Sequence, residues 1–485
     1  MPFAARVSSF IAAGALACTP AEEAATYLAC SDAAVCPTDQ GCVYGLCVPR
    51  CSDDDGPTCV EGEVCQDDGM CANACDDAHP CTQAFTCMDG ACAADPCGHP
   101  EFWPHSLESA DLPVIVHYRD ELERDEAQRS LDAVERSWDL ETSMLGFRPP
   151  LLDGGLCGPD ERFDGYIWRS YRGGVSNVIT ENSETPWDDR INYLIVDPWG
   201  PYGGAVLEAT VAHELNHAMQ AADDWNETAI FFEMSAQFIE DQVYDDANGW
   251  IDLLYDYQAH PEWSFDYNDD YETLFFYGSA LYLFYLREGV FAGDASFLSE
   301  VWLRCRNPAG ENEPDMADSL DAVLRERGGS SYEASLLGFA RWRWAPRGLD
   351  GTDGFEETDL LPENARVPLV ATLRADDAPV ESTVMVLGSR YISVGRSAPG
   401  QGQVLLRFDG DPTVRWVVQT TNGLAPDEDG APLVLAAGTT QVELGTADTR
   451  TIVVTALPLT DAGYDPETRT TDTFGFHLSV EPAGG

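Results

Sequence analysis

Residues 206–222 read VLEATVAHELNHAMQAA, and they contain the word His213-Glu214-Leu215-Asn216-His217. Apolar residues recur along one side of this stretch and neither proline nor glycine interrupts it, which predicts a helix with a core-facing side. Residues four apart lie one turn apart on the same helix face. The imidazoles of His213 and His217 can therefore bind one metal ion, and this spacing is typical of zinc sites.

A carboxylate directly follows the first histidine of this word. Catalytic zinc has three protein ligands and a water in the remaining position, and Glu214 is placed to take a proton as the zinc-bound water attacks a carbonyl. The sequence therefore predicts metal-assisted hydrolysis, with a peptide bond as the substrate. The alternative is a surface helix that happens to carry these residues, and the apolar side of the segment argues against it.

Two acidic residues are candidates for the third zinc ligand. Glu233 lies among aromatic residues in AIFFEMSAQFIE (229–240), which is predicted to be a second buried helix, and a metal would remove the cost of burying its carboxylate. Asp223 follows His217 at the offset of the third ligand in the pattern H-E-x-x-H-x-x-G-x-x-H. Gln220 occupies the glycine position of that pattern, so the sharp turn that glycine permits has no obvious means here, and Glu233 is favoured.

The two segments resemble the gluzincin branch of the zincin metallopeptidases, in which a glutamate on a later helix completes the H-E-x-x-H site. They are also similar to secreted bacterial metallopeptidases with the motifs H-E-x-x-H-A-x-Q and W-x-x-E-x-x-A-x-W-x-E, with phenylalanine here in place of tryptophan. The resemblance covers residues 100–345. It implies an α+β zincin-like domain in which the edge strand of a twisted sheet borders the cleft, with His213, His217 and Glu233 as zinc ligands and Glu214 as the general base.

The resemblance also draws attention to groups around the ligands. Gln237 stands where thermolysin-like enzymes have an acidic partner for the first histidine. Glu240 is the alternative partner, although an exposed acid on the outer helix face is expected there. Tyr277 is the candidate for stabilising the oxyanion, with His260 and Tyr271 as alternatives, and most of the tyrosines are expected to be packing residues.

The chain is strongly acidic. Its 485 residues contain 27 lysines and arginines against 84 aspartates and glutamates, which gives a net charge of −57. A field of this sign repels phosphate backbones and anionic membranes, which argues against nucleic acid as a partner. The length predicts more than one domain.

Residues 1–18 are predicted to be an export signal. Arg6 supplies a positive charge ahead of the apolar run 7–16, which is too short to span a membrane. Ala15-Leu16-Ala17-Cys18 resembles a bacterial lipobox, so Cys18 is a candidate for lipidation and membrane anchorage. No other run is apolar enough for a transmembrane helix, and we expect a secreted or cell-surface protein.

Twelve cysteines between residues 19 and 97 fall into three similar groups, which indicates an internal repeat. They are Cys30, Cys36, Cys42 and Cys47; Cys51, Cys59, Cys65 and Cys71; and Cys75, Cys81, Cys87 and Cys92. Units this short cannot bury a sufficient core, so two disulfides per unit are expected, and the segment resembles small EGF-like repeats. Zinc ribbons are the alternative but need C-x₂-C pairs. Structural calcium at Asp53, Asp54 and Asp55 is a further candidate, with solvated turns as the simpler interpretation.

Cys18, Cys97, Cys157 and Cys305 lie outside these groups. A disulfide between Cys97 and Cys157 is the expected pairing, and it would tie the repeats to the next domain. Cys305 is then expected to be a buried free thiol.

The order of predicted elements divides the rest of the chain. Strands and then helices in 98–345 agree with the zincin-like domain, and 346–364 is rich in Gly, Asp and Glu and reads as a linker. Residues 365–485 contain short alternating strands, which is typical of an all-β sandwich and suggests an accessory module. The strands predicted in the second domain are 112–118, 163–169, 177–180 and 191–197, with an amphipathic helix at 125–145.

Three function classes fit these features. The first is a secreted or surface-anchored zinc metallopeptidase. The second is a non-catalytic surface adhesin or binding protein on a degenerate zincin scaffold, and the third is a zinc hydrolase of non-peptide amides. The intact H-E-x-x-H word favours the first.

Overall fold

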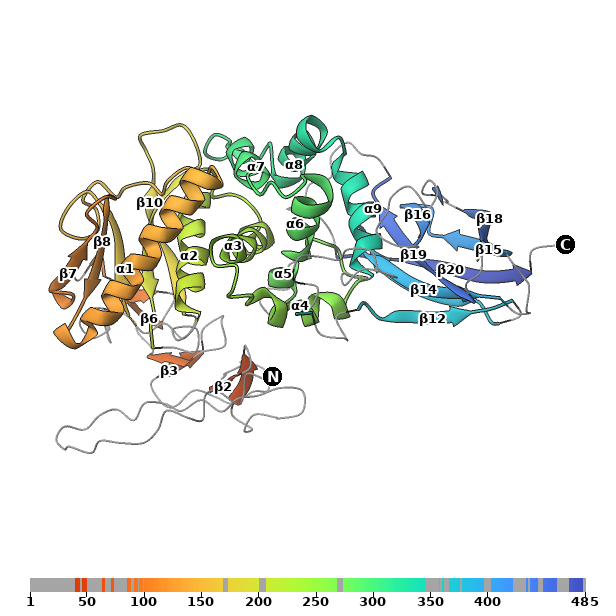
Figure 1. The fold of residues 1–485 in the computed structure, drawn as a ribbon, viewed down its shortest axis with the longest axis horizontal. Helices are drawn as coiled ribbons and strands as arrows, with labels where there is room; N and C mark the ends of the chain where they lie inside the picture. Colours follow the sequence, from red (N-terminus) through yellow and green to blue (C-terminus); the bar gives the residue numbers. More distant parts are fainter. Residues whose placement is uncertain are drawn as a thin grey trace. The chain divides into compact units, whose positions relative to one another are not determined.

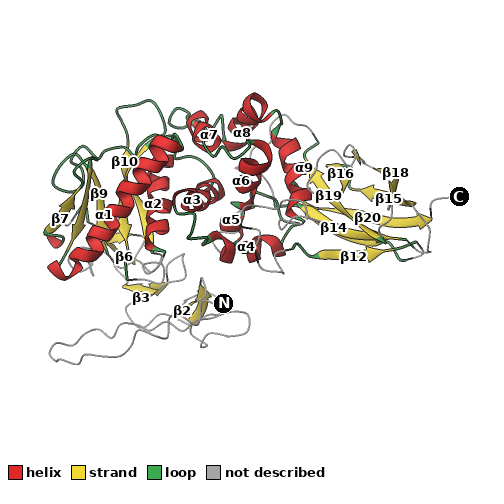
Figure 2. Cartoon of the chain, viewed as in Figure 1, coloured by secondary structure: helices red, strands yellow, loops and turns green. Residues whose placement is uncertain are grey.

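The computed structural model describes residues 100–344 apart from 169–172, 200–205 and 268–273, parts of 357–482, and short segments between 40 and 98. The chain divides into two compact units, Met1–Trp103 and Pro104–Gly485. Figure 1 traces the elements in sequence order, and Figure 2 separates helices from strands. Among the described residues, no helix combines the length and apolar character needed to cross a membrane. The predicted export signal and Cys18 lie outside the described residues.

Within the described part of the first unit, each cysteine group contains a β-hairpin. The hairpins are β1 (Gln40–Val43) with β2 (Leu46–Pro49), β3 (Glu63–Cys65) with β4 (Cys71–Asn73), and β5 (Phe85–Met88) with β6 (Ala91–Ala94). The last two cysteines of each group stand opposite one another, as Cys42 with Cys47, Cys65 with Cys71 and Cys87 with Cys92. This common register supports an internal repeat. The side chains of these hairpins and residues 53–55 lie outside the description, so the repeat disulfides and the calcium site stay predictions.

The second unit begins with a mixed sheet in the order β10-β11-β9-β8-β7. Its strands are β7 (His105–Glu108), β8 (Val114–Tyr118), β9 (Phe163–Ile167), β10 (Gly174–Glu181) and β11 (Arg190–Val196). β8, β9 and β11 run parallel, whereas β7 and β10 are antiparallel to their neighbours. Every residue of β8 and β9 is buried, as expected at the parallel centre of a sheet. The strands predicted at 112–118, 163–169 and 191–197 are confirmed, and 177–180 is part of the longer β10.

Two helices pack against this sheet. α1 (Arg124–Asp139) contacts β8, and α2 (Leu207–Ala221) contacts β10 and β11 (Figure 1). The helix predicted at 125–145 is confirmed, except that its last turn, η5 (Leu140–Met144), is π-helical. The two helices also pack on each other, so the sheet positions α2 from one side and α1 holds it from another.

Helices dominate the next part of the chain, as predicted. They are α3 (Ala229–Val243), α4 (Trp250–Ala259), α5 (Phe275–Gly278), α6 (Leu281–Tyr285), α7 (Phe297–Cys305), α8 (Met316–Val323) and α9 (Tyr332–Arg343), with π-helical turns η6 (Leu286–Val290) and η7 (Leu324–Gly328). Aromatic side chains fill the space between them. Phe231 of α3 stacks on Trp302 of α7 with ring centroids 4.4 Å apart, and Phe238 of α3 meets Phe284 of α6 edge-on. These contacts hold α3 in place, and other residues of α3 contact α2.

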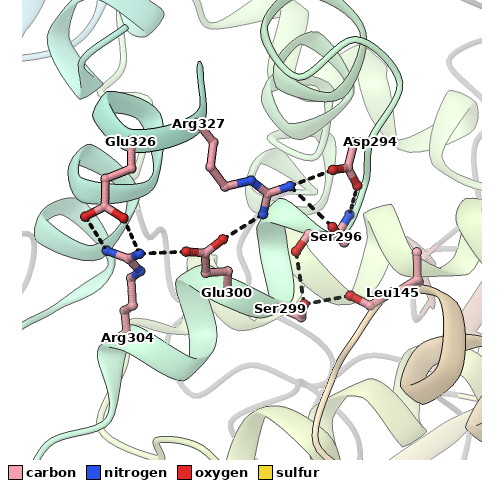
Figure 3. Close-up of polar contacts among 8 residues, drawn as sticks. All are labelled: Leu145, Asp294, Ser296, Ser299, Glu300, Arg304, Glu326 and Arg327. Atoms are coloured by element: carbon pink, nitrogen blue, oxygen red, sulfur yellow. Dashed lines mark hydrogen bonds and ion pairs between the residues drawn. The ribbon is translucent and has the colours of Figure 1, made fainter. Parts of the chain in front are cut away.

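A polar cluster on α7 joins several of these elements (Figure 3). Glu300 accepts hydrogen bonds from Arg304 at 2.6 Å and from Arg327 of η7 at 2.7 Å. Ser299 on the same helix donates to the carbonyl of Leu145 at 2.6 Å. The half-exposed ion pairs contribute little each, but the buried Ser299 bond fixes the chain directly after η5.

The chain ends in two β-sheets, in the orders β12-β14-β19-β16-β17 and β13-β20-β15-β18. Their strands are β12 (Leu369–Leu373), β13 (Val380–Met385), β14 (Ser389–Gly395), β15 (Gln403–Gly410), β16 (Arg415–Thr420), β17 (Leu433–Val434), β18 (Ala437–Glu443), β19 (Thr449–Leu457) and β20 (Thr473–Pro482). Residues of both sheets share one hydrophobic core, in which Trp416 meets Phe408 and Phe476 edge-on. The all-β character predicted for this region is confirmed.

The β region is packed against the helical region of the same unit. The loop after α4 supplies part of the contact, because Met385 and Ser389 donate backbone hydrogen bonds to the carbonyls of Glu262 (2.9 Å) and Pro261 (2.7 Å). Helix α9 supplies another part, since Tyr391 donates to the carbonyl of Ala340. Arg390 adds a 3.0 Å ion pair with the Glu262 carboxylate. The described residues thus show a β module that packs against the helical region, while 346–356 of the predicted linker lie outside the described residues.

Three cysteines beyond the repeats are described. Cys97 and Cys157 are both disulfide-bonded. Cys305, the last residue of α7, is a buried free cysteine. Burial raises the pKa of its thiol, which keeps the group neutral and unreactive.

Candidate metal centre

Helix α2 is buried along most of its length. Val211, Leu215 and Met219 have no exposed surface, and the helix contacts α1, α3, β10 and β11. Its apolar residues therefore face neighbours on several sides. His213 and Glu214 are only 7% and 9% exposed, and polar groups withdrawn from water in this way need partners.

Helix α3 brings Glu233 to both histidines. Glu233 Oε2 lies 3.0 Å from His213 Nε2 and 3.5 Å from His217 Nε2. The two imidazole rings are 4.6 Å apart and nearly perpendicular. Ligand atoms about 2.0–2.1 Å from a tetrahedral zinc ion are ~3.3 Å from one another. His213, His217 and Glu233 form a group that could hold a metal ion. The distances from Glu233 Oε2 to the two Nε2 atoms are close to this ligand–ligand distance.

The other nitrogen of each imidazole is occupied by an acceptor. Glu240 Oε1 lies 2.8 Å from His213 Nδ1, and Gln220 Oε1 lies 2.8 Å from His217 Nδ1. Carboxylate and amide oxygens only accept, so both Nδ1 atoms carry a proton, and each Nε2 is the atom that would bind a metal after releasing any proton of its own. The expectation that Glu240 is an exposed acid on the outer helix face is therefore wrong. It takes the position of the acidic partner, which Gln237 does not.

The electrostatics of the site couple these groups. Burial opposes the charge on His213, but its hydrogen bonds to Glu233 and Glu240 outweigh burial and hold its pKa well above the usual value. Burial would raise the pKa of Glu233, but the charge of His217 and the hydrogen bond from His213 lower it instead. Glu233 is therefore an anion, as a metal ligand must be.

The side chain of Glu214, which belongs to α2, lies against the strand β10. Burial raises its pKa, while the neighbouring histidines and a backbone hydrogen bond from Ser176 oppose the shift. Gly174 is packed so tightly against it that an added Cβ would come within 2.5 Å of Glu214 Cγ. Among the described strands, β10 has β11 as its one neighbour, so the strand that contacts Glu214 is the edge of the sheet.

The remaining candidates differ in position. Asp223 pairs with Arg148 at 3.0 Å and is not in the metal-binding group, so the structure does not bring it to the histidines. The Tyr277 ring is 6.1 Å from the His213 ring, which places it beside the site. His260 stacks on Trp263, and Tyr271 lies outside the described residues.

Two residues next to the site were not predicted from the sequence. Asn216 of α2 donates to Glu141 of η5 at 2.9 Å and accepts from Gln220 at 2.7 Å. Both Asn216 and Glu141 are fully buried. The sequence does contain a signal for Asn216, because an amide at a buried position of an apolar helix requires a polar partner. The partner, Glu141, could not be identified because it is far away in sequence.

Two groups of acids among the described residues could also hold a cation. They are Asp241, Asp245 and Glu357, and Glu313, Asp315 and Asp318. Neither contains an imidazole. Burial and the neighbouring Glu357 and Asp245 raise the pKa of Asp241 to about 8, so this carboxyl is mostly protonated at neutral pH.

No protein-family model matches the chain, and no curated protein matches it. The similar solved structures include the pre-peptidase C-terminal domain of a collagenase from Bacillus anthracis, which is 8% identical over 24% of this chain and 97% of that chain, with a TM-score of 0.16. They also include PliG of Aeromonas hydrophila, a periplasmic inhibitor of g-type lysozyme, which is 13% identical over 23% of this chain and 96% of that chain, with a TM-score of 0.16. Similarities at these TM-scores carry no argument about fold or activity.

Proposed function

We propose that this chain is a zinc metallopeptidase with a gluzincin-type site and a zincin-like domain around it. The observation that carries the proposal is the convergence of His213, His217 and Glu233 on one point, with Glu214 buried beside them. The mixed sheet with an antiparallel edge strand next to the H-E-x-x-H helix supports it. His213, His217 and Glu233 would hold the zinc ion.

The chemistry divides between the ion and the protein. A bound Zn²⁺ would supply a Lewis acid that lowers the pKa of water and polarises the substrate carbonyl. Glu214 accepts a proton from the attacking water and returns it to the departing amine. Its raised pKa brings it closer to neutral pH, where a general base works best.

Two further elements would position the substrate. An extended peptide can add to the edge of a sheet through backbone hydrogen bonds, and β10 offers such an edge along Glu214. Tyr277, beside His213, is the proposed donor to the oxyanion of the tetrahedral intermediate. Both assignments depend on the zinc site.

The decisive experiment replaces Glu214 by its neutral isostere. Glu214→Gln is expected to lower kcat by about 10²–10⁴-fold, because the general base is lost, while one zinc per chain is retained because Glu214 is not a ligand. Cleavage of a peptide library, measured with and without a chelator, and zinc content by atomic spectroscopy are the two readouts.

Glu208→Gln is the matched control, since Glu208 is on the same helix but pairs with Arg129 at 2.6 Å. It should leave both readouts unchanged. Zinc binding without turnover in the unaltered chain would favour a non-catalytic binding protein. A chain that binds no zinc would refute the proposal.

We also propose that the protein acts outside the reducing cytoplasm. Cys97 and Cys157 are disulfide-bonded, and structural disulfides persist in oxidising compartments. This supports export of the chain, secreted or attached at the cell surface through Cys18. Mass spectrometry of the mature N-terminus tests it, because a lipidated Cys18 and a freely secreted chain differ in mass.

A further inference from the structure

A chain of buried hydrogen bonds leads away from His217. Its Nδ1 lies 2.8 Å from Gln220 Oε1, Gln220 Nε2 donates to Asn216 Oδ1 at 2.7 Å, and Asn216 Nδ2 donates to Glu141 Oε2 at 2.9 Å. Gln220, Asn216 and Glu141 are each fully buried. Hydrogen bonds in such a place do not compete with bulk water and hold their donors and acceptors in one arrangement.

The direction of these bonds is set by the acceptors around the Gln220 amide. Its NH₂ group donates to Asn216 Oδ1 and also to the carbonyl of Phe232 at 3.1 Å. Both amide protons are then engaged, so the amide oxygen is the atom that faces His217. The imidazole must donate through Nδ1, and its Nε2 is left facing Glu233.

The far end of this chain is held by other elements. Glu141 belongs to the π-helical turn η5, and such turns are frequent at functional sites. Its carbonyl accepts from Phe147 at 2.9 Å, and the next turn is tied to α7 by the bond from Ser299 to Leu145 (Figure 3). Burial raises the pKa of Glu141, so the carboxyl is neutral and needs no counter-charge.

We propose that Glu141, Asn216 and Gln220 are positioning residues that fix the Nδ1–H tautomer of His217 and so present its Nε2 to the metal. This inference rests on the metal site proposed above. Glu240 of α3 orients His213 directly, whereas His217 is oriented by Glu141 of η5 through the amides of Gln220 and Asn216. Glu141, which reaches His217 only through two amides, is therefore expected to affect zinc affinity.

Paired variants at Glu141 test the hydrogen-bond chain. Glu141→Met removes the acceptor for Asn216 and is expected to weaken zinc binding by about 10–100-fold, whereas Glu141→Gln keeps an amide oxygen there and should stay within about threefold of the unaltered chain. Affinity is measured on the full chain by competition with a chromophoric chelator. Gln220→Met removes the acceptor next to His217 and is expected to show the same loss, which provides a second variant if Glu141→Met does not fold.

A second measurement reads the tautomer without zinc. In metal-free protein labelled with ¹⁵N-histidine, at about pH 9 where an ordinary imidazole is neutral, His217 should show the proton on Nδ1, and Gln220→Met should move it to Nε2. A chain that binds no zinc would refute the proposed function but leave this readout intact. Equal losses of affinity in Glu141→Met and Glu141→Gln, or an unchanged His217 tautomer in Gln220→Met, would overturn the inference.

Discussion

At the scale of single residues, several side chains of the site contact more than one neighbouring group. Glu233 and Glu240 lie two turns apart on α3 and contact opposite nitrogens of His213, at 3.0 and 2.8 Å. One is the proposed ligand and the other fixes the tautomer. Glu214 likewise has His213 and His217 on one side and the β10 backbone on the other. A small displacement of any of these groups therefore affects several contacts.

Gly174 makes this dependence measurable. In Gly174→Ala the new Cβ would lie 2.5 Å from Glu214 Cγ, so the carboxylate has to move. A displacement of about 1 Å at a catalytic group can lower the rate by ~10²-fold. We expect a loss of that order in kcat with zinc content unchanged, measured by peptide cleavage and metal analysis. Gly165→Ala in β9 is the control, because its nearest contact is an ordinary 3.5 Å from Val116. Equal activity in the two variants would contradict this role of Gly174.

At the scale of elements, the sequence predicts most of the site and the strands around it. The H-E-x-x-H word gives the spacing of His213 and His217 by helix geometry alone, and the isolated carboxylate among aromatic residues indicates Glu233. The sequence could not decide whether Glu240 contacts His213 or lies exposed. The reason is that packing against α7 determines which face of α3 meets α2. The contribution of Glu141 was hidden for a similar reason, since a π-helical turn has no clear sequence signature and its partner Asn216 is distant in the chain.

A buried carboxyl on helix α3 predicts that the stability of the protein depends on pH. Asp241, near its C-terminal end, has a pKa of about 8, because burial and the nearby Glu357 and Asp245 outweigh the charge of Arg287. In the unfolded chain its pKa is about 3.9. Between these values the native state retains a proton that the unfolded state has released, so stability falls as pH rises through this window and the full penalty is present above pH 8.

The variant Asp241→Asn removes this penalty. It is expected to raise the free energy of unfolding by about 1–3 kcal/mol at pH 8.5 and to change it little at pH 4. Denaturant unfolding at the two pH values measures the difference, with EDTA present because Asp241, Asp245 and Glu357 could hold a cation. An equal effect of the variant at both pH values would show that the carboxyl does not titrate in this window.

At the scale of the whole unit Pro104–Gly485, the β region and the helical region are held together by backbone contacts rather than by side chains alone. The loop after α4 supplies the carbonyls of Pro261 and Glu262 to Ser389 and Met385. Gly388 lies against this loop, where a Cβ would come 2.3 Å from the Glu262 carbonyl oxygen and 2.8 Å from that of Trp263. All of these atoms belong to the backbone of the loop, so no flexible side chain can give way, and glycine is required by close approach.

Gly388→Ala is therefore expected to separate the two regions. The overlap should lower the free energy of unfolding by about 1–3 kcal/mol, as overpacking does in other cores, and calorimetry of the full chain should show the β region melting at a lower temperature than the helical region. Gly475→Ala is the control, because it is in the same β region with nothing within 4 Å of the added Cβ, and it should leave the melting profile unchanged. If the Gly388 variant melts as the Gly475 variant does, the contact with the loop after α4 is not what joins the β region to the proposed catalytic domain.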